Sequence, residues 1–271
     1  MTRTSASPAA NADFHGARSQ DFDQGNADKN TMETVFALLR RTVPEGVVLD
    51  VPSGAGSFSR RLLAAGYRVR AGDIVENPQL EGAEFAHCDL NERLDLEDAS
   101  VDAVVCIEGI EHLRRPFDFV DECARVLRPG GTLILTTPNI SALRSRWRWL
   151  LTGFHNKCKV PLDENHPEPR HHINMLSFPE IRYMLHTSGL RITDVTTNRV
   201  KPISWLYLPL VPLQWLAARI TVAQAKDRDL DRDVARVWLD RPRDEDAPPD
   251  ATTGENGEDD ERPGLVQIRR R

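Results

Sequence analysis

Two carboxylates and an imidazole lie close together in the sequence, at Glu108, Glu111 and His112. On a helical turn, residues three apart share a face, so Glu108 and Glu111 would point to one side with His112 beside them. Carboxylate oxygens and imidazole nitrogens suit Mg²⁺, Mn²⁺ or Zn²⁺. His171 and His172 follow in a Pro/His-rich loop and offer a further ligand. These residues predict a divalent metal site or, with no ion bound, a general base at His112 or His171.

A second cluster of candidate residues surrounds a glycine-rich turn. Gly54 and Gly56 follow a short apolar run that ends near Asp50. Glycines at such a turn let a ligand approach the main chain closely. Asp73 and Asp89 follow the next two apolar runs, and an acid at Asp73 can accept hydrogen bonds from both hydroxyls of a ribose. The same glycine pair also occurs as a purely structural turn, so on its own it is a weak signal.

Two other nucleotide-binding motifs are missing from this turn. Pro52 occupies the first glycine position of the dinucleotide fingerprint Gly-x-Gly-x-x-Gly, and no third glycine follows. The turn also lacks the Gly-Lys-Ser/Thr of a phosphate-binding P-loop. A nicotinamide dehydrogenase and a nucleoside triphosphatase are therefore disfavoured.

The elements that must position these residues alternate between strands and helices. Apolar runs predict strands at 47–51, 67–71, 85–88, 101–107, 132–136 and 190–197, and helical periodicity predicts helices at 31–42, 58–65, 117–127, 139–152 and 178–187. Such alternation is typical of βαβ crossovers, which build a doubly wound, mainly parallel α/β sheet with helices on both faces. Residues 265–268 are either a late strand at the sheet edge or part of the C-terminal tail.

The order of these motifs resembles that of the class I S-adenosylmethionine-dependent methyltransferases, over residues 31 to about 200. The acid and Gly-x-Gly of that family's first motif correspond to Asp50, Gly54 and Gly56, and the turn at 127–131 corresponds to the turn before its fifth strand. The resemblance implies a Rossmann-like, seven-stranded-type fold and S-adenosyl-L-methionine as cofactor. The cofactor-binding residues that it implies are Asp50, Gly54, Gly56, Asp73, Asp89, Leu90 and Glu108.

The spacing of the Glu-His group is similar to a narrower pattern. It resembles the ubiquinone-pathway O-methyltransferases and the small-RNA 2′-O-methyltransferases, in which a Glu-x-x-Glu-His group chelates a divalent ion. That resemblance implies Glu108, Glu111, His112 and His172 as metal ligands. A Glu-His pair after the fourth strand also occurs in methyltransferases that bind no metal, where the histidine supports the loop. Both interpretations stay open at the level of sequence.

Apolar and basic residues beyond this core indicate a surface for a partner. Arg144, Arg146 and Arg148 alternate with Trp147 and Trp149, and no acidic residue occurs from 139 to 162. The apolar run at 205–215 is too short and too interrupted by proline to span a bilayer. Tryptophan and arginine favour a peripheral membrane contact. The alternatives are a nucleic acid, disfavoured because an apolar run does not serve RNA, and an ordinary core or dimer contact.

The net charge of −6 over 271 residues is unevenly distributed. Residues 240–261 carry −8, which leaves +2 for the remainder. We therefore divide the chain into a flexible segment at 1–30, a methyltransferase domain at 31–200 with a substrate lid at 139–175, an apolar, membrane-contacting segment at 201–221, and a charged helix with a disordered acidic tail at 222–271.

Because residues 1–30 lack the apolar core of a signal peptide, we expect a cytoplasmic protein, or one at the cytoplasmic face of the membrane.

Together these features predict an O-methyltransferase. The expected acceptor is a hydroxyl of a quinone precursor, a lipid or a lipid-linked sugar. The alternatives are an RNA ribose 2′-O-methyltransferase and a non-catalytic S-adenosylmethionine-binding partner protein. The sequence is silent on oligomeric state.

Overall fold

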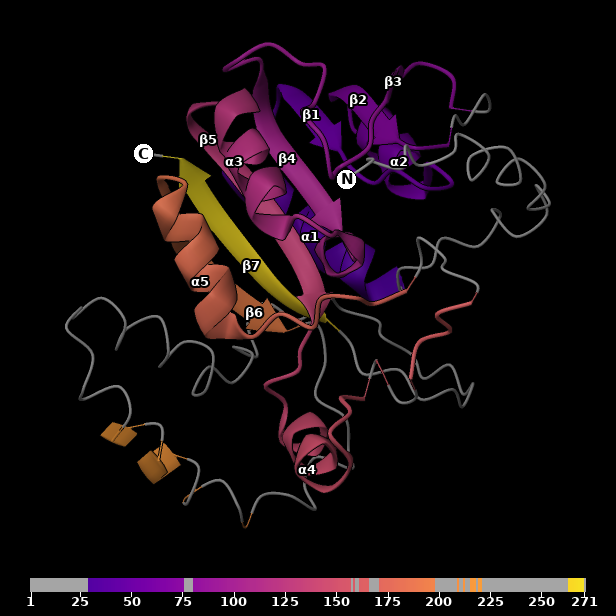
Figure 1. Cartoon of the computed structure of the whole chain (residues 1–271). Helices are drawn as coiled ribbons and strands as arrows, with labels where there is room; N and C mark the ends of the chain where they lie inside the picture. Colours follow the sequence, from indigo (N-terminus) through magenta and orange to yellow (C-terminus); the bar gives the residue numbers. More distant parts are fainter. Residues whose placement is uncertain are drawn as a thin grey trace, which may run out of the picture.

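The strands of the chain form a single sheet in the order β3-β2-β1-β4-β5-β7-β6 (Figure 1). The computed structural model describes residues 29–75, 80–156, 158, 161–165, 171–197 and 263–270, with positions 209, 212, 215–217, 219 and 220. The strands are β1 (Val47–Asp50), β2 (Arg68–Asp73), β3 (Glu84–His87), β4 (Val101–Ile107), β5 (Leu127–Pro138), β6 (Leu190–Thr197) and β7 (Pro263–Arg270). The helices are α1 (Lys29–Thr42), α2 (Ser57–Ala64), α3 (Pro116–Val126), α4 (Leu143–Thr152) and α5 (Phe178–Thr187), with a 3-10 turn, η4, at Ile110–His112.

Strand direction confirms the predicted mainly parallel, Rossmann-like sheet. Strands β1 to β5 pair in parallel, whereas β7 runs antiparallel to both β5 and β6. The late strand expected near 265–268 is present, but it lies between β5 and β6 and not at the edge of the sheet. The range 31–200 therefore omits one strand of the sheet, because this strand comes from the far end of the chain.

Helices cover both faces of the sheet, as the alternating side chains of the central strands require. In β4, Ala103 and Val105 join the apolar cluster formed with α1 and α2, whereas Val104 and Cys106 join the cluster formed with α3 and α5. Successive strand residues point to opposite faces, so a strand that is apolar throughout must be covered twice. This double burial holds the carboxyl ends of the strands at one fixed edge.

Element boundaries agree best where local capping signals are strong. Helix α5 spans the predicted residues because Ser177 and Glu180 form a capping box at its start. Helix α4 begins at Leu143 and not at residue 139, since the Asn139 side chain accepts a hydrogen bond from the Ser141 main chain and holds a turn there. The expectations for 1–28, 222–262 and most of 198–221 lie outside the described residues. Among the helices that are described, none is long and apolar enough to span a bilayer.

Candidate functional site

The candidate site lies where the strand order changes direction. Strand β1 pairs with β2 on one side and with β4 on the other, so the ends of β1 and β4 meet at one edge of the sheet. Ligands of open α/β sheets bind outside the carboxyl ends of the strands at such a point. The glycine-rich turn follows β1 and the Glu-His turn follows β4, so the fold brings the two predicted groups to the same place.

The glycine-rich turn is tied to the end of β2 by one of the predicted carboxylates. The Gly54 main-chain N–H donates to Asp73 Oδ2 at 2.8 Å. Gly54 and Gly56 have φ values of 51° and 72°, a region that favours glycine. Gly56 also caps the start of α2, so main-chain N–H groups of that helix lie beside the turn. This arrangement suits a ligand with an anionic group and a ribose, as the resemblance to methyltransferases implies.

Asp50 lies beneath this turn and supports it. Its side chain is buried, with 2% of the residue exposed, and the Ser59 hydroxyl of α2 donates to its Oδ2 at 2.5 Å. Burial raises the pKa of Asp50 to about 7, the hydrogen bond from Ser59 opposes this rise, and the negative charge of Asp73 adds to it. This hydrogen bond joins the end of β1 to α2, the two elements that flank the glycine-rich turn.

Asp89 and Leu90 lie just beyond β3, at the same edge of the sheet. The Cys88 main-chain N–H donates to the Asp73 carbonyl at 2.9 Å, which ties this segment to the end of β2. Asp89 Oδ1 accepts two hydrogen bonds from Asn91, from the main-chain N–H at 2.8 Å and from Nδ2 at 2.9 Å. Leu90 is buried in the core. Asp89 is thus held by its own turn beside the other predicted cofactor residues.

The Glu-His turn after β4 is anchored by the apolar residues within it. Ile110, the first residue of η4, and Leu113, which follows it, are both buried in the core and so fix the position of η4. Glu108, just before η4, has a φ of 49°, which is uncommon for a residue with a side chain. The Thr136 hydroxyl on β5 holds both the main chain and the side chain of Glu108. Its Oγ1 accepts from the Glu108 main-chain N–H at 2.9 Å and donates to Glu108 Oε1 at 3.2 Å.

Three of the four predicted metal ligands come together. One ligand atom from each of Glu111, His112 and His172 lies within 4.8 Å of the others, and Glu111 is fully buried. Among the described residues, neither Glu108 nor the His171 side chain belongs to this group. The expectation that Glu108 and Glu111 share a helical face was wrong in its geometry, because Glu108 precedes a 3-10 turn and has a left-handed main chain.

The donor set fits a divalent ion. One carboxylate with two imidazoles is a ligand set of catalytic zinc, which leaves a position open for water or substrate. In a tetrahedral site with ligand bonds of roughly 2.0–2.2 Å, the donor atoms lie about 3.3–3.6 Å apart. The ligand atoms of this group, which lie within 4.8 Å of one another, would therefore move closer by up to roughly 1.5 Å to hold one ion.

Hydrogen bonds fasten the loop at 171–174 to the Glu-His turn, and two of them come from Asn174, which the sequence analysis did not single out. His112 Nδ1 lies 3.1 Å from the His171 carbonyl oxygen, which can only accept, so the proton is on Nδ1 and the ring's lone pair is on Nε2. The Asn174 main-chain N–H donates to the Glu111 carbonyl at 2.9 Å, and Asn174 Nδ2 donates to the Leu113 carbonyl. His171 therefore takes part through its main chain. Only the closeness of Asn174 to the two histidines could have pointed to it.

Gly109 places the two turns in contact. A Cβ atom on Gly109 would lie 2.5 Å from Pro52 Cδ of the glycine-rich turn and 2.9 Å from Cys106 Sγ. Atoms do not approach so closely, so only glycine allows this packing. The glycine-rich turn and the Glu-His turn therefore pack against each other as parts of one site.

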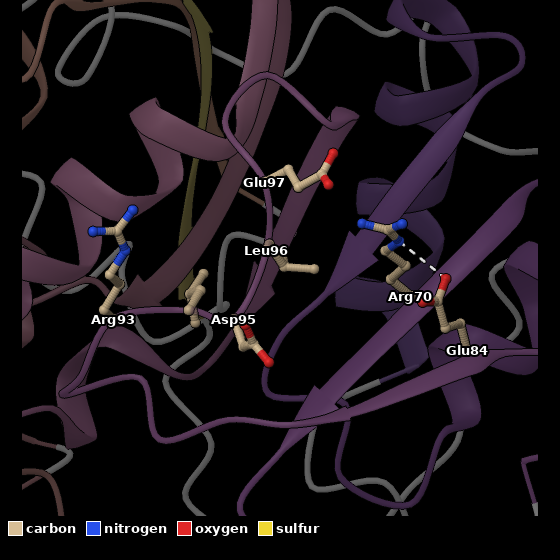
Figure 2. Close-up of a pocket in the computed structure, with 7 residues that line it drawn as sticks. Arg70, Glu84, Arg93, Asp95, Leu96 and Glu97 are labelled. Atoms are coloured by element: carbon tan, nitrogen blue, oxygen red, sulfur yellow. Dashed lines mark hydrogen bonds and ion pairs between the residues drawn. The ribbon is translucent and has the colours of Figure 1, made fainter.

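A charged surface hollow lies elsewhere on the molecule. Figure 2 shows it between β2, β3 and the loop at 93–97, with an ion pair of 3.1 Å between Arg70 and Glu84. None of the predicted cofactor, metal or catalytic residues lines it. We therefore assign it no part in the site.

Comparisons with known proteins show methyltransferase relatives and a shared fold. Residues 49–135 match the methyltransferase domain family. The chain is 31% identical to the ubiquinone biosynthesis O-methyltransferase of Xylella fastidiosa over 184 residues, which cover 64% of this chain and 72% of that protein. It is 28% identical to the protein of the same name in Xanthomonas campestris pv. campestris over 186 residues, 64% of this chain and 74% of that one. The crystal structure of the cyclase SpnF shares the fold, with a TM-score of 0.51, 15% identity, and coverage of 92% of this chain and 84% of SpnF.

Proposed function

Because the chain belongs to the class I S-adenosylmethionine-dependent methyltransferases, we propose that it methylates a hydroxyl oxygen of a quinone precursor, a lipid or a lipid-linked sugar. The observation that carries the proposal is the group formed by Glu111, His112 and His172 beside the glycine-rich turn. A hydroxyl is a weak nucleophile at neutral pH, so its methylation needs a residue or an ion that removes or weakens its bond to the proton. Both bacterial relatives are named as O-methyltransferases, which supports the choice of oxygen as acceptor.

We propose further that these three residues hold a divalent ion, for which Glu111, His112 and His172 supply a carboxylate and two imidazole ligands. A bound ion would lower the pKa of an acceptor hydroxyl and fix its direction. The His171 carbonyl orients the His112 ring and keeps its proton on Nδ1, so that Nε2 faces the reaction as a lone pair. Asn174 keeps the loop that carries His172 in place.

The transfer itself balances simply. The acceptor oxygen forms a bond to the methyl carbon as the bond from that carbon to the sulfonium sulfur breaks, which leaves S-adenosylhomocysteine. The hydroxyl proton leaves toward solvent or toward a base. The glycine-rich turn and Asp73 would hold the cofactor so that its methyl group points at the Glu-His turn, and positioning of this kind accounts for much of the rate increase in such reactions.

Labelled cofactor tests the reaction. We expect the purified protein, incubated with S-adenosylmethionine labelled on the methyl group and a cell extract, to place label in the fraction that organic solvent extracts. The label should resist conditions that cleave methyl esters and should be lost on cleavage of ethers. Label in RNA would support the ribose 2′-O alternative and overturn the acceptor class. Cofactor binding without label in any fraction would show a non-catalytic binding protein.

Chelation tests the metal. We expect dialysis against EDTA to lower turnover at least about 100-fold and added Mg²⁺, Mn²⁺ or Zn²⁺ to restore it. Glu111→Gln and His172→Asn should lower both turnover and bound metal, measured by elemental analysis. His87→Asn, which changes an exposed histidine at the end of β3, is the matched control and should alter neither. Full activity in EDTA would remove the ion from the proposal and leave His112 Nε2 as the general base.

A further inference from the structure

Helix α4 presents large apolar side chains to solvent. Trp147, Leu150 and Leu151 are 43%, 67% and 66% exposed. Residues at i, i+3 and i+4 lie on the same face of a helix, so these three form one continuous surface, which we call the α4 stripe. Figure 1 shows α4 standing away from the sheet and from the helices that cover it.

The opposite side of α4 packs on the segment that follows it. Ser145 is buried, its Oγ lies 3.2 Å from His155 Nδ1, and the Asn156 main-chain N–H donates to it at 3.4 Å. Trp149, four residues after Ser145 and so on the same side of the helix, stacks on the His155 ring with centroids 6.1 Å apart. These contacts fix the rotation of the helix, so the α4 stripe faces away from the protein.

Positive charge borders the α4 stripe. Arg144, Arg146 and Arg148 lie in the same helix, and no acidic residue occurs between 139 and 162. An amphipathic helix with tryptophan and leucine on one side and arginines around them is typical of helices that lie in the interface of a lipid bilayer. Arginines there attract anionic headgroups, while their apolar stems remain against the lipid.

A second part of the chain repeats this composition. Trp215, Leu216 and Ile220 are exposed, at 45%, 52% and 55%. The Arg219 guanidinium carbon lies 5.5 Å from the centroid of the Trp215 ring. No acidic residue occurs between 201 and 221. Two separate segments that combine exposed tryptophan and aliphatic residues with arginine, and without acid, favour the same kind of partner.

We propose that α4 docks this protein on the surface of an anionic lipid bilayer, with the α4 stripe inserted among the lipids and the arginines among the headgroups. Aliphatic side chains such as Leu150 and Leu151 contribute nothing to stacking on bases, which favours lipid over RNA as the occupant. The helix follows β5 at the edge of the sheet that carries the candidate site, so docking would bring that edge to the membrane. This inference goes beyond the methyl transfer and is independent of the acceptor.

Vesicle flotation of the full chain, without cofactor or acceptor, tests the docking. We expect binding to vesicles of phosphatidylcholine with 30% phosphatidylglycerol and much weaker binding to phosphatidylcholine alone. Binding should weaken as NaCl rises from 50 to 500 mM, because salt screens the arginines. Leu150→Gln combined with Leu151→Gln should lower the partition coefficient at least about tenfold, and each Arg→Gln at 144 and 148 about fivefold.

Matched variants keep the result interpretable. Tyr183→Gln changes a side chain on α5 that is 63% exposed, close to the exposure of Leu150, and should float as the unaltered protein does. Thermal unfolding of each variant separates lost docking from lost folding. Equal flotation of the Leu150/Leu151 variant and the unaltered protein would overturn the proposal. So would a gel shift with RNA in the absence of flotation, or an α4 stripe that proves to be a dimer contact by light scattering.

Discussion

Asp50, the acid of the first motif, is a predicted cofactor residue with a buried carboxyl. The Ser59 hydroxyl donates a hydrogen bond to this carboxyl. Burial raises the pKa of this carboxyl from its ordinary value of 3.8 to about 7. Between these two pH values the unfolded chain loses this proton while the folded protein keeps it. The unfolded state then binds fewer protons, so this carboxyl lowers the free energy of unfolding as pH rises.

An Asp50→Asn variant should remove this dependence. Asparagine is nearly isosteric and its side-chain oxygen can still accept from the Ser59 hydroxyl. The quantity to follow is the difference in the free energy of unfolding, unaltered protein minus variant. This difference should fall by about 1.4 kcal/mol per pH unit from about pH 4 to 7 and should level off above pH 7. Urea unfolding at several pH values measures this difference. The exposed Asp95→Asn is the control, and a difference for Asp50→Asn that stays flat with pH would contradict the prediction.

Other site residues show where residue type and spacing in the sequence are enough to predict a contact, and where they are not. Gly54 and Asp73 were predicted together and are in contact, because strand order and turn geometry place them with little freedom. Glu108 was predicted as a ligand and bonds Thr136, since a single left-handed residue redirects the chain before the 3-10 turn. Spacing along the sequence cannot reveal such a local reversal. It also could not reveal Asn174, whose hydrogen bond to Leu113 joins residues 61 positions apart in the sequence.

At the scale of elements, the two turns of the site depend on each other through Gly109. Its φ and ψ of −119° and −43° are open to any residue, so the need for glycine is steric. In Gly109→Ala, the new Cβ would meet Pro52 and Cys106 and push the Glu-His turn away from the glycine-rich turn. We expect the affinity for S-adenosylhomocysteine, measured by calorimetry, to fall at least about tenfold, with a loss of about 1–3 kcal/mol in the free energy of unfolding.

Gly189→Ala is the control for this loss of stability. Gly189 follows α5 with a φ of 76°, and a Cβ there would have open space around it. Alanine should cost roughly 1 kcal/mol because of the left-handed main chain, without moving either turn. Its affinity for S-adenosylhomocysteine should stay unchanged. If Gly109→Ala also binds like the unaltered protein, the two turns are not coupled in the way that the packing indicates.

The fold of the whole molecule was largely predictable, except for its last strand. Hydrophobic runs of strand length separated by amphipathic helices determine the layers, since each face of the sheet must be covered. The position of β7 follows from no such pattern, because residues 263–270 pair with strands that end at 138 and 197. Local periodicity carries no information about which distant strand a short run will join. An isolated apolar run at the end of a polar tail therefore looks optional in sequence although it completes the sheet.

Two neighbouring residues of β7 test whether this strand belongs to the core. Ile268 is fully buried in the cluster under α3 and α5 and pairs with Leu133 and Ile192, whereas the adjacent Arg269 is exposed. Ile268→Ala should lower the free energy of unfolding by about 2–4 kcal/mol, through lost burial and the cavity left behind. Arg269→Ala should change it by less than about 0.5 kcal/mol. Urea unfolding measures both, and equal small effects would mean that the sheet is stable without β7. The predicted asymmetry would instead show that β7 is part of the core, and β6 pairs with the rest of the sheet through this strand.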